Sequence, residues 1–186
     1  MNREKNLFSR TEMLNMNVKL LKKRGVEIDD IAHIAFLQQS KWNPNISYRE
    51  CKDSVEKILS LRDVFHLVQL GAEIDRLTEE HAFEGPIQEI LASDLGMFGI
   101  DELFGIEVAG MYGTIGKTNF GDIDINKPGI VAKLNEEGKS DKPACHTFLD
   151  DIVGAIAAAA STRVAQIENE NEANKDPSII EEPKLF

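Results

Sequence analysis

Residues 147–166 read TFLDDIVGAIAAAASTRVAQ, and this stretch decides the fold. It predicts a helix whose middle, Ile152 to Ala160, is the longest apolar run in the chain. This run is too short to cross a bilayer, because a spanning helix needs about 20 apolar residues. Its side chains are small, so the backbone of a second helix can approach it closely. We therefore expect this helix to be one member of a central helix pair.

The expected partner lies in residues 101–117, where Gly110, Gly113 and Gly116 recur at every third position. If this segment is helical, the glycines form a smooth strip that another helix can approach. Each glycine costs a helix about 1 kcal/mol relative to alanine, which indicates that close packing excludes bulk there. The alternative is a flexible glycine-rich loop. On the packing interpretation, Gly113→Leu is expected to lower both stability and metal affinity.

The rest of the chain also carries helical signals. Apolar spacing, capping residues and Pro86 predict further helices over residues 5–24, 28–41, from Ser47 through Leu77, and 86–93. Residues 133–142, KLNEEGKSDK, are predicted to be a polar loop. Strand-like alternation is nearly absent. The expected fold is an all-α, single-domain bundle of about six to eight helices over residues 1–167, followed by an acidic, flexible tail at 168–186.

The composition excludes several classes of protein. The formal net charge is −11 and the sequence pI is near 4.8, with no stripe of basic residues, so we expect no nucleic-acid partner. Cys51 and Cys145 lack the spacing of a zinc site or a disulfide framework, which favours a reduced, cytoplasmic protein. Residues 1–20 carry charges throughout, unlike a signal peptide. With no membrane span predicted, a lipid substrate would be met at the inner face of the membrane.

Acidic residues set in apolar or glycine-rich sequence are the candidates for chemistry. They form three groups: Asp101-Glu102, Asp122 with Asp124, and Asp150-Asp151. Adjacent carboxylates are costly to bury, so each group needs an explanation. One is the capping of a helix N-terminus. The other is a hard cation such as magnesium, which binds oxygen ligands. The concentration of three groups in one stretch favours the metal.

Other candidate residues are assigned structural roles. Glu79 and Glu80 are predicted to be solvated, and His146, four residues before Asp150, is expected to be structural rather than part of a site. The sequence contains no P-loop, nucleophile elbow or H-E-x-x-H pattern.

The blocks FGIDELFG, FGDIDINKPG and FLDDIVGAIAAA together resemble the C-terminal half of the phosphatidylglycerophosphatase A family. The whole chain is similar to the soluble branch of that family, the low-temperature-requirement C or YutG-like domains. It lacks the Gly-x-Gly…Pro-Gly-Thr opening and the apolar spans of the membrane members. The matching residues are Asp101, Glu102, Gly105, Phe120, Asp124, Lys127, Pro128, Asp150 and Asp151.

The resemblance implies a magnesium-dependent phosphatase that converts phosphatidylglycerophosphate into phosphatidylglycerol. The implied Mg²⁺ would polarise phosphoryl oxygens and orient water. Lys127 would contact the substrate phosphate, although a surface lysine before Pro128 is the alternative. The implied catalytic and metal-binding residues are Asp101, Glu102, Asp124, Asp150 and Asp151.

Two other functions remain open at this point. An all-α nucleotide pyrophosphohydrolase would use the same chemistry, but the chain has no convincing Glu-x-x-Glu pattern on a helix. A non-enzymatic regulatory or scaffold protein would use its carboxylates only as caps or to bind a structural metal. The glycine and alanine strips also suit contacts between copies, so we expect a homo-oligomer.

Overall fold

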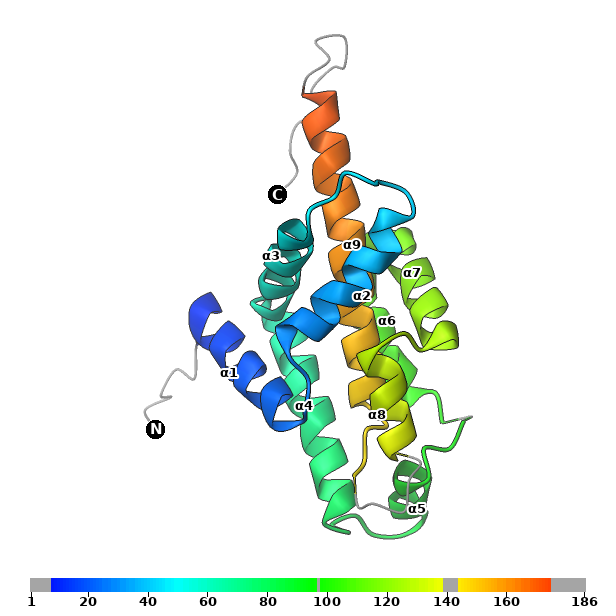
Figure 1. Cartoon of the computed structure of the whole chain (residues 1–186). Coiled ribbons are helices and arrows are strands. Elements are labelled where there is room, and N and C mark those ends of the chain that lie inside the picture. The colour runs from blue at the N-terminus through cyan, green and yellow to red at the C-terminus, as the bar shows by residue number, and fades with distance from the viewer. Residues whose placement is uncertain (1–7, 97, 139–143, 175–186) are drawn as a thin grey trace.

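The computed structural model describes residues 8–96, 98–138 and 144–174. These residues form nine α-helices and no strand, which confirms the prediction of an all-α single domain (Figure 1). The helices are α1 (Arg10–Lys23), α2 (Ile28–Ser40), α3 (Tyr48–Leu59), α4 (Arg62–Glu79), α5 (Pro86–Ala92), α6 (Ile100–Gly110), α7 (Gly113–Asn126), α8 (Ile130–Gly138) and α9 (Leu149–Ala173).

Local signals set several helix starts. Ser47 caps α3 by accepting the backbone N–H of Glu50 at 3.2 Å, while the Glu50 carboxylate accepts the N–H of Ser47 at 2.9 Å. Ser9 and Glu12 form the same capping box at α1. Pro86 occupies the first turn of α5, where its missing N–H costs nothing. These starts follow from the sequence because each depends on neighbouring residues.

Helix α9 is the axis of the bundle. In Figure 1 it runs through the middle of the molecule, and its most extensive contacts are with α7 and α6, followed by α2 and α3. Every side chain from Ala155 to Ala160 is fully buried. Small side chains let several helices approach one backbone, so the predicted central helix has two main partners rather than one.

The length of α9 does not make it a membrane span. It has 25 residues, but Asp150 and Asp151 lie in its first turn and Arg163 and Glu168 interrupt its second half. No helix in the part of the chain that the structure describes is long and apolar enough to cross a bilayer.

The predicted glycine strip is wrong. The backbone turns after Gly110, and Gly113 starts α7 with a φ of +76° and no atom within 4 Å of an added Cβ. The packing argument for Gly113→Leu therefore fails. Close approach occurs at Gly105, which faces the Phe120 ring, and at Gly116, which faces the backbone of Ala109. These glycines allow α6 and α7 to pack closely against each other; they do not form a surface against which α9 packs.

Gly116→Ala is expected to lower the free energy of unfolding by about 1–3 kcal/mol, because the new methyl group would overlap the Ala109 carbonyl and push α6 from α7. Gly121→Ala is the matched control in the same helix. Its Cβ meets no atom within 4 Å, so we expect a gain of about 0.5–1 kcal/mol. Urea unfolding measures both changes, and equal losses in the two variants would contradict the packing claim.

The predicted loop at residues 133–142 is also wrong over its first part, which belongs to α8. Ile130, Val131 and Leu134 are buried on one face of this helix, and that stripe begins upstream of the polar run. With α6 and α7 separate, α8 takes the count above the predicted six to eight helices. Residues 139–143 lie outside the described residues. Helix α9 continues to Ala173, within the predicted tail, and residues 175–186 lie outside the described residues.

A buried carboxylate cluster as the candidate functional site

Three helix ends meet at one group of charged side chains. Asp150 and Asp151 come from the start of α9, and Asp124 and Lys127 from the end of α7. The Lys127 ammonium nitrogen lies 2.7 Å from Asp124 Oδ1, 3.1 Å from Asp150 Oδ2 and 3.6 Å from Asp151 Oδ1. Asp101, in the first turn of α6, contributes its charge to the environment of Asp151. We call these five residues the carboxylate cluster.

The end of α7 places Lys127 at the centre of the cluster. Its N–H donates to the carbonyl of Ile123 at 2.8 Å, and its backbone is left-handed, with a φ of +41°. Pro128 follows and prevents the helix from continuing. The Lys127 side chain then reaches Asp124, one turn back, and Asp150 across the helix interface.

The start of α9 is capped by another helix. Asp75, a fully buried residue of α4, accepts the N–H groups of Phe148 at 3.1 Å and Leu149 at 3.0 Å. Phe148, the N-cap residue itself, makes no side-chain cap. Asp75 therefore caps the first two N–H groups, and Asp150 Oδ1 accepts the N–H of Asp151 at 3.0 Å. Asp150 Oδ2 and Asp151 Oδ1 face Lys127.

Burial dominates the acidity of the cluster. It raises the pKa of Asp101 and that of Asp150 to about 6 each. Burial and the charge of Asp150 raise the pKa of Asp151 further. Burial alone would lower the pKa of Lys127, but the negative charge of Asp150 and the hydrogen bond to Asp124 outweigh it and raise that pKa. The cluster is thus a set of carboxylates held together by one cation.

Asp101→Asn is expected to stabilise the metal-free protein near pH 7.5 by on the order of 2 kcal/mol and to leave it unchanged near pH 4. The folded state holds the Asp101 proton more tightly than the unfolded chain does, because the pKa rises from 3.8 to about 6. The contribution of Asp101 to the stability of the wild type therefore falls as the pH rises from 3.8 to about 6. Thermal unfolding in chelator at both pH values measures the difference, and a variant less stable near pH 7.5 would contradict the sign.

The other predicted acidic residues lie at or beyond the edge of the cluster. Glu102 is partly exposed and donates its backbone N–H to Asp101 Oδ1 at 3.1 Å, a bond that lowers the pKa of Asp101 more than the charge of Glu102 raises it. Asp122 is exposed and binds the Asn126 side chain at 2.9 Å. Glu102 can join a site through Asp101, whereas Asp122 is a surface residue.

Asp75 and Asp94 also belong to this neighbourhood, although neither residue was predicted from the sequence. Asp94 is partly buried in a left-handed turn, and its charge raises the pKa of both Asp101 and Asp150. Asp75 stands on the apolar face of α4, in line with the buried Val68 and Ala72. A charged residue on an apolar helix face indicates a buried carboxylate, so Asp75 could have been found from the sequence. No such pattern surrounds Asp94.

Glu79 is not solvated, contrary to the prediction. Arg24 donates to both of its carboxylate oxygens, at 3.0 and 2.8 Å, and the N–H of Cys145 donates to Glu79 at 2.8 Å. Arg24 also donates to the Cys145 carbonyl. His146 is buried beside Arg24, and burial lowers its pKa. This network fixes the chain just before α9, and with it the direction in which Asp150 and Asp151 point.

The donor chemistry of the cluster fits a hard cation. Hard cations prefer oxygen ligands, which the carboxylates of the cluster supply. Three of these carboxylates already surround the positive charge of Lys127. Across residues 8–96, 98–138 and 144–174, no three acidic, histidine or cysteine side chains stand together as a ready metal site. Binding a cation would therefore require the Lys127 ammonium to give way.

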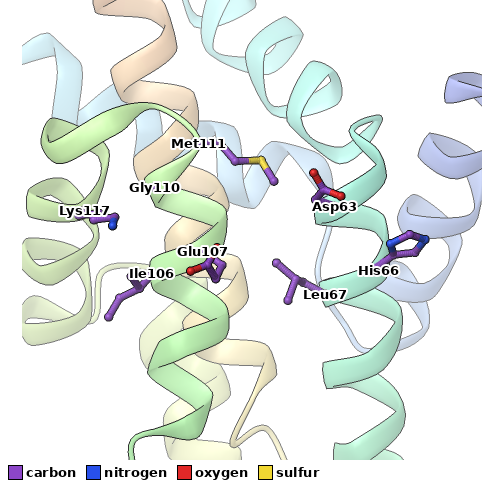
Figure 2. A pocket seen from close by; sticks show the side chains of 8 residues that line it. All are labelled: Asp63, His66, Leu67, Ile106, Glu107, Gly110, Met111 and Lys117. Carbon is purple, nitrogen blue, oxygen red and sulfur yellow. The ribbon is translucent and has the colours of Figure 1, made fainter.

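A groove of about 510 Å³ between α4 and α6 is separate from this cluster (Figure 2). Figure 2 shows Leu67 and Met111 beside the gap, with Asp63 and His66 on the α4 side and Glu107 on α6. None of the five cluster residues lines it. The case for the cluster as a functional site therefore depends on the charge and burial of its residues and not on this groove.

The fold and the cluster define a class: an all-helical protein with buried acidic residues at the meeting point of three helix ends. The chain belongs to the phosphatidylglycerophosphatase A family, whose model matches residues 24–166. This match includes every residue of the cluster.

Relatives support the assignment over most of the chain. YutG of Bacillus subtilis (strain 168) is 43% identical over 145 residues, which are 78% of this chain and 86% of YutG. YpjQ of the same organism is 41% identical over 158 residues, 85% of this chain and 87% of YpjQ. The crystal structure of the low temperature requirement C protein from Listeria monocytogenes has a TM-score of 0.81 and 42% identity. It covers 87% of this chain and 99% of that protein.

Proposed function

We propose that the protein is a magnesium-dependent phosphatase that hydrolyses a phosphate monoester, with phosphatidylglycerophosphate as substrate and phosphatidylglycerol as product. One observation carries the proposal: three buried or partly buried carboxylates from α7 and α9 gather around one positive charge in a chain of the phosphatidylglycerophosphatase A family. Burying these charges costs stability, which is expected of a functional site. The lipid would be met at a bilayer surface.

The cluster residues have distinct roles in this proposal. Asp124, Asp150 and Asp151 would hold Mg²⁺, with Glu102 and Asp101 at the edge of the site. The ion would polarise the phosphoryl group and neutralise its developing charge. Lys127, released from the carboxylates, would bind a phosphate oxygen as a point charge. Asp101 is not bonded to Lys127 and is the carboxylate best placed to accept a proton from the attacking water.

Phosphate release from phosphatidylglycerophosphate, in detergent and in vesicles, tests the function. We expect release in the presence of Mg²⁺ and none after EDTA treatment. A nucleoside triphosphate and a simple phosphate monoester are measured beside it. Hydrolysis of the triphosphate alone would replace the proposal with a pyrophosphohydrolase. Inactivity on every substrate, together with a melting temperature that falls in EDTA, would favour a structural metal in a non-enzymatic protein.

A further inference from the structure

A second groove, of about 420 Å³, lies beyond the cluster along α9. It is lined by the end of α2, the following loop, α7 and the second half of α9. Thr162, on its wall, is eleven residues beyond Asp151 in the same helix, or about 16 Å along the axis. A phosphate held in the cluster would not reach this groove. We call it the Trp42 groove, after the aromatic residue that lines it.

Neutral hydrogen-bonding side chains make up the wall of the Trp42 groove. Asn119 donates to Thr162 Oγ1 at 3.0 Å, and Ser161 donates to Gln39 Oε1 at 3.3 Å. These bonds join α2, α7 and α9, and they leave the Gln39 amide N–H groups and the side-chain Oδ1 of Asn119 free of any bond among the described residues. The wall therefore offers both donors and acceptors in fixed positions.

Gln38 is the residue that points to a ligand. Its side chain lines the groove, is 8% exposed and donates to the carbonyl of Asn119 at 3.3 Å. Its Oε1 is buried and finds no hydrogen-bond partner among the described residues. A buried acceptor without a donor costs about 1–3 kcal/mol, so proteins seldom keep one without cause. A small shift of this amide would let a ligand hydroxyl or N–H supply the missing donor.

The rim of the groove adds apolar surface without positive charge. Trp42 is 82% exposed and Ile115 is 65% exposed, although both are large apolar residues. None of the described residues that line the groove is Lys or Arg. Its one acidic group, Glu168, already accepts a hydrogen bond from Asn43 at 2.5 Å. An anion such as a phosphate or a nucleotide would find no countercharge here.

We propose that the Trp42 groove binds a neutral, hydroxyl-rich ligand of the size of a monosaccharide or disaccharide. Hydroxyls donate and accept at once, which matches a wall of free amide N–H groups and carbonyl oxygens. The face of the Trp42 indole can lie against the C–H face of a sugar ring. A volume of about 420 Å³ is within the range of small-molecule sites. This binding is independent of the phosphatase activity.

The fluorescence of Trp42 gives the test, because the chain contains one tryptophan. Glucose, maltose and glycerol are titrated into the protein, with inorganic phosphate as the charged comparison, and calorimetry repeats any positive result. We expect a saturable change with at least one sugar. In Gln38→Leu and, as a second variant on a less buried residue, Asn119→Ala, we expect binding to weaken at least about tenfold. Leu37→Ala, at a neighbouring exposed residue outside the groove, is expected to bind as wild type does.

Three results would overturn the proposal. The first is the absence of a saturable signal with every neutral probe. The second is a signal of equal strength in wild type, Gln38→Leu and Asn119→Ala, with circular dichroism showing that the variants are folded. The third is saturation by phosphate in place of the sugars.

Discussion

Asp151→Asn is expected to reduce magnesium-dependent phosphate release on the order of 10³-fold while the protein stays folded. Asp151 is 5% exposed and faces Lys127, so its charge is available to a bound cation rather than to solvent. Asparagine keeps the shape but removes the charge that would hold Mg²⁺. The loss should appear in kcat as well as in the magnesium concentration needed for half activity. Steady-state release across a magnesium series measures both.

Asp122→Asn is the matched control for this prediction. Asp122 belongs to the same acidic block as Asp124, but it is exposed and its carboxylate accepts a hydrogen bond from Asn126. We expect wild-type activity and stability in this variant. Equal losses in Asp122→Asn and Asp151→Asn would show that general acidity, rather than the cluster, supports the reaction. Full activity in Asp151→Asn would remove that residue from the site.

Lys127→Met is expected to lower the free energy of unfolding by about 3 kcal/mol near pH 7.5 in chelator. The ammonium is the group that neutralises Asp124, Asp150 and Asp151, and removing it leaves buried carboxylates without a partner. Methionine keeps most of the stem, so lost packing contributes little. Near pH 5 the loss should shrink, because the raised pKa values allow the aspartates to hold protons in the folded state. Urea unfolding at both pH values measures the effect.

A second substitution separates charge from packing. Asp150→Asn added to Lys127→Met removes one of the stranded charges and should recover part of the lost stability. Lys133→Met removes an exposed lysine whose nearest carboxylate oxygen, on Glu137, is 3.9 Å away, and it should change stability little. A Lys127→Met loss that is the same at both pH values and is not relieved by Asp150→Asn would contradict the role of Lys127 as the countercharge.

The sequence was informative where structure depends on neighbouring residues. The boundaries of α2, α3 and α5 follow from apolar spacing, the Ser47–Glu50 capping box and Pro86, and the structure has them within a residue or two. The small apolar residues of α9 pointed to a buried central helix. The family was inferred from three short blocks, and the match to residues 24–166 confirms it.

Features that depend on contacts between distant parts of the chain could not be predicted from the sequence. Whether Gly113 sits in a helix or at a turn is decided by the angle between α6 and α7, which local propensity does not set. The role of Asp75 requires the end of α4 to meet the start of α9, residues far apart in the chain. The same is true of Lys127: the sequence offered it as a phosphate ligand or a surface lysine, and the structure places it among three aspartates.

Direct cation binding is the measurement that tests the central claim most closely. Mn²⁺ is titrated into chelator-treated wild type, Asp151→Asn and Asp122→Asn, and free Mn²⁺ is followed by electron paramagnetic resonance, with Mg²⁺ added to compete. The cluster account predicts saturable binding by wild type and Asp122→Asn, displacement by Mg²⁺, and loss of binding in Asp151→Asn. Undiminished binding by Asp151→Asn, or no binding by wild type, would contradict it.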